Sequence, residues 1–64
     1  MDKGLTYQQA RAVLAHTAHK HYSRRELVSR LHLVDPGAQV ADKQSALSVA
    51  YMIAWRLLPA ERKQ

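Results

Sequence analysis

The chain has 64 residues, enough for one small domain, and a domain of this size buries only roughly 60% of the surface that its unfolded chain exposes. It contains no cysteine, which excludes disulfides and thiolate metal sites. Ten Lys and Arg residues against five Asp and Glu give a net charge of +5, which favours anionic partners and nucleic acid first. We therefore expect a single domain over 1–64 that gains stability from a second copy.

The sequence shows no targeting or membrane-spanning segment. It begins Met1-Asp2-Lys3-Gly4, without the apolar stretch of a secretory signal. Its longest apolar run is well short of the roughly 18 residues that a membrane span requires. These features predict a cytoplasmic protein.

The first predicted helix spans 7–22, with Thr6 as its N-cap. Helical spacing predicts an inward face made of Tyr7, Ala10, Val13, Leu14, Thr17, Ala18 and His21. The remaining positions, which we expect to face solvent, are Gln8, Arg11, Ala15, His16, His19 and Lys20.

The second predicted helix spans 24–32. Ser23 and Glu26 have the spacing of a capping box, in which each side chain bonds the backbone amide of the other residue. The inward positions are Leu27, Val28 and Leu31, and the outward ones are Arg25, Ser29 and His32. After them, Pro36 and Gly37 predict a break in the helix, with at most a short extra turn at 36–41.

The third predicted helix spans 42–58, with Asp42 as its N-cap and Pro59 ending it. It carries two apolar strips, one of Leu47, Ala50, Tyr51, Ala54 and Leu58 and another of Val49, Ile53 and Leu57. A helix that is apolar on most of its circumference must be covered on most of it. The predicted fold is all-α, a compact three-helix bundle, and we expect the third helix to be covered in part by a second copy in a homodimer.

Enzymatic and metal chemistry lack a matching set of residues. His16 and His19 could reach one metal ion, but no third ligand accompanies them, so we expect solvated histidines. Of the five acids, two are predicted caps, one lies in a turn and two lie near the termini. We expect no catalytic residue, no bound metal, no cofactor and no small-molecule substrate.

A DNA-binding function is the first hypothesis. Two helices joined tightly at Tyr22 and Ser23 suit a helix-turn-helix motif, with the second helix as the recognition helix of a transcriptional regulator. The candidate contacts are Arg24, Arg25, Ser29, Arg30 and His32, with Arg11 and Lys20 beside them. In another register, 24–34 would be the supporting helix of the motif. That stretch resembles the supporting helix of bacterial repressors but has His32 where a glycine is commonest.

The alternative hypothesis is a small inhibitor or adaptor that binds one partner protein. Aromatic residues, Met and Arg are enriched in interface cores. The third predicted helix concentrates them, and the candidate interface residues are Val49, Tyr51, Met52, Ile53, Trp55 and Arg56.

Overall fold

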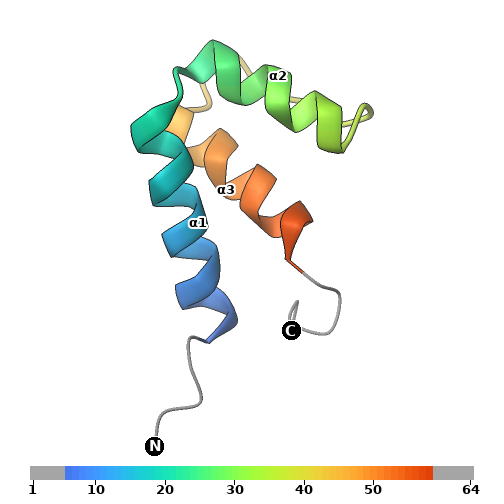
Figure 1. Ribbon diagram of the computed structural model, residues 1–64. Coiled ribbons are helices and arrows are strands. Elements are labelled where there is room, and N and C mark those ends of the chain that lie inside the picture. Colours follow the sequence, from blue (N-terminus) through green and yellow to red (C-terminus); the bar gives the residue numbers. More distant parts are fainter. Residues whose placement is uncertain (1–5, 59–64) are drawn as a thin grey trace, which may run out of the picture.

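The computed structural model describes residues 6–58 and shows three α-helices, with no strand in that range. They are α1 (Tyr7–His21), α2 (Arg24–Val34) and α3 (Ala46–Leu57) (Figure 1). The all-α prediction with three helices is confirmed.

The first two helices begin at the predicted caps. The Thr6 hydroxyl accepts a hydrogen bond from the Gln9 amide at 3.1 Å, and the Gln9 side chain accepts one from the Thr6 amide at 3.0 Å. Ser23 and Glu26 form the same reciprocal pair, at 3.2 and 2.9 Å. Each box satisfies two of the amides that a helix leaves unpaired at its start.

The second helix ends two residues later than predicted, at Val34. Its C-cap is Asp35, whose amide donates to the Leu31 carbonyl at 2.7 Å. Because Pro36 restricts only the residue before it, the helix can continue up to Asp35. Leu33 and Val34 therefore lie on the last turn of α2 and not in a loop.

The third helix begins at Ala46, so the prediction of a start at 42 with Asp42 as the cap is wrong. The cap is Ser45, whose hydroxyl accepts from the Ser48 amide at 3.1 Å. Residues 41–44 form a closed turn instead. The Gln44 amide donates to the Ala41 carbonyl, and the Ala41 amide donates to the Gln44 side chain, both at 3.0 Å.

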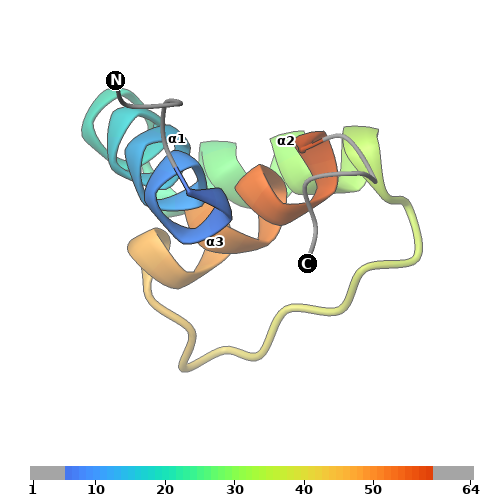
Figure 2. The ribbon, with the colours of Figure 1, turned by 90° about the horizontal axis from the view of Figure 1, so that it is seen from below.

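The α3 helix is the element on which the other two helices pack. Both α1 and α2 pack on it, and they touch each other much less than either touches α3. In Figure 1, α2 begins beside the C-terminal end of α1 and points away from that helix. Residues 35–45, which we call the strap, return from the end of α2 to the start of α3 as a long loop along one side (Figure 2). No further helix forms at 36–41; 36 and 37 make a turn closed by the Ala38 amide on the Asp35 carbonyl at 3.0 Å.

The core is small and lies where the three helices meet. Its fully buried large side chains are Leu27, Leu31 and Val49. The other buried side chains are Ala15, Ala50, Ile53, Ala54 and Leu58. Alanines on both α1 and α3 let these two helices approach closely. The inward positions predicted for α2 are confirmed for Leu27 and Leu31, and Val28 packs against the same cluster.

The predicted inward face of α1 is wrong in part. Ala15, assigned to the solvent side, is completely buried, whereas Val13 is 53% exposed. Leu14, Thr17 and His21, also assigned inward, are exposed as well. The position of Arg11 explains why the observed inward face of α1 differs from the predicted one. Its guanidinium lies over the rings of Tyr51 and Trp55, so a charged residue occupies an inward position that hydrophobic patterning gives to an apolar one.

Candidate nucleic-acid interface

The end of α1 and the start of α2 form a basic surface, which we call the basic corner. Its residues are His19, Lys20, His21, Arg25, Ser29 and Arg30, and all six are exposed. Only Tyr22 and Ser23 separate the two helices, so the last turn of α1 and the first turns of α2 are neighbours (Figure 1).

Tyr22 ties Arg30 to this corner. The guanidinium carbon of Arg30 lies 3.9 Å from the centre of the Tyr22 ring, a close cation–π contact. The contact fixes the side chain of Arg30 while its charge stays at the surface. Arg30 thus points back toward the link between α1 and α2.

Glu26 is the acidic residue of this corner, and its carboxylate forms part of the N-terminal cap of α2. The backbone hydrogen bond with Ser23 is the main reason that the pKa of Glu26 is lowered; the Ser23 hydroxyl and the nearby Arg30 lower it further. The carboxylate is therefore held as an anion at the N-terminus of α2, where the helix dipole favours it. No ion pair to Lys20, Arg25 or Arg30 occurs within residues 6–58.

Arg24 does not point outward; its side chain bonds the backbone of the strap. Its Nε donates to the Gln44 carbonyl at 2.7 Å and its terminal nitrogen donates to the Ala41 carbonyl at 2.9 Å. These bonds hold the closed turn of the strap against the start of α2. Arg24 and Arg25, which the sequence treats alike, thus differ in role.

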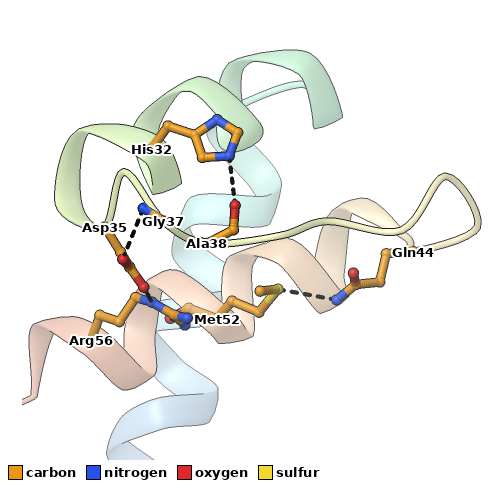
Figure 3. A network of polar contacts seen from close by, with 7 residues as sticks. All are labelled: His32, Asp35, Gly37, Ala38, Gln44, Met52 and Arg56. Carbon is orange, nitrogen blue, oxygen red and sulfur yellow. Dashed lines mark hydrogen bonds and ion pairs between the residues drawn. The ribbon is translucent and has the colours of Figure 1, made fainter.

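Two other residues predicted to contact DNA lie away from the corner or are partly engaged. Arg11 packs on the aromatic rings of α3, and Tyr7 adds an edge-to-face contact to Trp55 with ring centres 5.1 Å apart. Within residues 6–58, Arg11 Nε and the Tyr7 hydroxyl are buried without hydrogen-bond partners. His32 is exposed, but its Nε2 lies 3.0 Å from the Ala38 carbonyl oxygen (Figure 3).

The strap is also held at its other end, by residues predicted for a protein interface. Arg56 Nε donates to Asp35 Oδ2 at 2.7 Å, and its terminal nitrogen donates to the Met52 carbonyl at 3.0 Å. The hydrogen bond from Arg56 is the main cause that lowers the pKa of Asp35. Gln44 donates to the sulfur of Met52 at 3.1 Å, so both residues serve the strap (Figure 3).

The remaining interface candidates serve the chain's own packing. Val49 is fully buried and Ile53 is 7% exposed, so neither offers more than a trace of surface to a partner. Tyr51 and Trp55 lie under Arg11. The core face of α3 is covered by α1 and α2, whereas Trp55 and Leu57 on the same helix are 38% and 58% exposed. The homodimer expected from the sequence stays a prediction.

A different apolar surface lies between α1 and α2, where they leave part of α3 uncovered. Two adjoining hollows of about 280 Å³ each share Ala18, Tyr22, Ile53 and Leu57. We call them together the apolar groove. Leu33, 83% exposed, and Leu57, 58% exposed, stand at its sides. Sequence reasoning missed this groove because the predicted α2 ended before Leu33; the Leu33-Val34 pair beyond Leu31 was the available signal.

Metal and membrane sites are not found in the described part of the chain. Within residues 6–58, no three His, Asp or Glu side chains are grouped as a metal site requires. In the same range, no helix is long and apolar enough to cross a bilayer.

Comparison with protein-family models, curated proteins and solved structures gives no match for this chain.

Proposed function

We propose that the protein is a non-enzymatic DNA-binding regulator that docks double-stranded DNA on the basic corner. The observation that carries the proposal is the cluster of exposed cations at the junction of α1 and α2, with the acid nearby bound into the helix cap. Phosphate contacts supply most of the affinity of such proteins, and cations without acidic partners make those contacts best.

The form of α2 supports binding in the major groove. Its 11 residues make a helix about 16 Å long, and a single helix fits the width of that groove. Arg25 and Ser29 lie one turn apart on the same exposed side. In this proposal they face base edges, while Lys20 and Arg30 contact phosphates. Arg24 keeps the strap in place and makes no DNA contact.

Binding is measured by fluorescence anisotropy with a short labelled DNA duplex over a range of salt concentrations. The double variant Lys20→Ala/Arg25→Ala should bind at least about tenfold more weakly at low salt, and its salt slope should fall by about 0.9, the contribution of the one phosphate contact assigned to Lys20. Circular dichroism should show unchanged helix content, because both side chains are exposed.

The matched control is the exchange Lys20→Arg/Arg25→Lys, which keeps both charges in place. It should retain most of the affinity for duplexes of mixed sequence. Wild-type protein that binds no duplex, or that binds with the same affinity after Lys20→Ala/Arg25→Ala, contradicts the proposal. Preference for single strands would contradict the docking of α2 in a major groove.

A further inference from the structure

We propose that the apolar groove binds an amphipathic helix of an acidic partner protein. The groove is a different surface from the basic corner, and Arg30 is the residue that borders both. The groove exists because α1 and α2 diverge over α3 and leave part of its side uncovered. Among residues 6–58, nothing removes its exposed leucines, Leu33 and Leu57, from water.

The size of the groove suits large side chains of a partner. Each hollow, at about 280 Å³, has room for one anchoring apolar side chain. The two hollows adjoin and share Ile53 and Leu57 in their lining, so two anchors from a single segment can occupy both. Anchors on successive turns of a helix have this adjacent arrangement.

The backbone of the occupant must satisfy its own polar groups. The groove is lined almost entirely by side-chain carbon, and residues 6–58 contain no strand whose edge could pair with an extended peptide. A helix satisfies its backbone internally, whereas an extended segment would leave amides and carbonyls unpaired against an apolar wall. The occupant is therefore a helix.

Charge identifies the partner as acidic. Arg30 lines the first hollow, and among residues 6–58 no acidic side chain lines either hollow. A second copy would bring the same Arg30 to the groove, on a chain with 10 Lys and Arg against 5 Asp and Glu. The terminal stretches outside 6–58, MDKGL and PAERKQ, do not combine two large apolar side chains with net negative charge. A partner with glutamates beside its apolar anchors fits both the apolar floor and the charged rim.

The test uses two synthetic Ala-based helical peptides with leucines on one face. One carries glutamates beside the leucines and the other carries lysines at the same positions. Titration into ¹⁵N-labelled protein should shift the amides of Ala18, Tyr22, Leu33 and Leu57 with the glutamate peptide. At low salt this peptide should bind at least about tenfold more tightly than the lysine peptide.

Three variants make the test specific. Leu33→Ser should weaken binding of the glutamate peptide by about tenfold, whereas Val13→Ser, an equally small change at an exposed apolar residue outside the groove, should leave it unchanged. Arg30→Gln should reduce the preference for the glutamate peptide without weakening the lysine peptide.

Four results would overturn the inference. They are equal affinity of the two peptides, no shift at the groove amides, equal effects of Leu33→Ser and Val13→Ser, and a dimer in sedimentation that Leu33→Ser dissociates. The last result would assign the groove to a second copy of the chain.

Discussion

Arg24 and Arg25 show how adjacent, identical residues acquire different tasks. Arg24 spans from the first turn of α2 to two carbonyls of the strap, whereas Arg25, one position later and about 100° further around the helix, faces solvent. The outward direction follows from the helical period. The inward bonds depend on a turn that lies 17 to 20 residues away in sequence.

Replacing Arg24 should destabilise the fold, while replacing Arg25 should not. Arg24→Ala removes two charge-assisted hydrogen bonds and should lower the free energy of unfolding by about 2 kcal/mol. Arg25→Ala, with no such bonds, should stay within about 0.5 kcal/mol of wild type. Urea denaturation followed by circular dichroism measures both. Equal effects of the two substitutions would show that Arg24 does not hold the strap.

The ion pair of Arg56 and Asp35 should make stability depend on acid. The folded-state pKa of Asp35 is lowered, so its contribution is present above the unfolded pKa of about 3.9 and is lost as the pH falls through the folded value. Asp35→Asn should lower the melting temperature at neutral pH, and its difference from wild type should vanish at strongly acidic pH. Glu26, also with a lowered pKa, leaves some acid dependence in the variant. A difference that stays constant from neutral to acidic pH argues against a contribution from the pair.

At the scale of elements, local signals and distant contacts can be separated. The starts of α1 and α2 were predictable from the sequence because a capping box is formed by residues three apart. The start of α3 was not, since Asp42 is also a good cap by local rules. The closed turn at 41–44, held by Arg24, decides against it. In the same way, patterning assigned Ala15 to the wrong face because it could not foresee Arg11 packing on two aromatic rings.

Capping substitutions test the observed start of α3. Ser45→Ala should lower the free energy of unfolding by about 1 kcal/mol, because the Ser48 amide loses its acceptor. Asp42→Ala, which removes the cap that the sequence predicts, should change it by less than about 0.5 kcal/mol. Thermal or urea unfolding of the two variants gives the comparison. A larger effect at Asp42 than at Ser45 would place the helix start where the sequence predicts it.

At the scale of the whole molecule, two unlike surfaces meet along α2. The basic corner occupies its outward side, and the apolar groove lies on the side that faces α1; Arg30 borders both. The sequence predicted the outward positions of Arg25 and Ser29, because helical spacing places them there, but it placed His21 on the inward face. The Leu33-Val34 pair signalled an apolar end of α2, but the shape of the groove also depends on the angle between α1 and α2, which no local pattern encodes.

The most direct test of the DNA-binding proposal is an NMR titration of the ¹⁵N-labelled protein with a short DNA duplex. It identifies the contacted surface as well as the affinity. The account predicts amide shifts at His19, Lys20 and His21 and along 25–30, reversed by added salt. The first turns of α1 and the strap should remain unaffected. Shifts confined to other surfaces, or no shifts at low salt, would contradict the assignment of the basic corner to DNA.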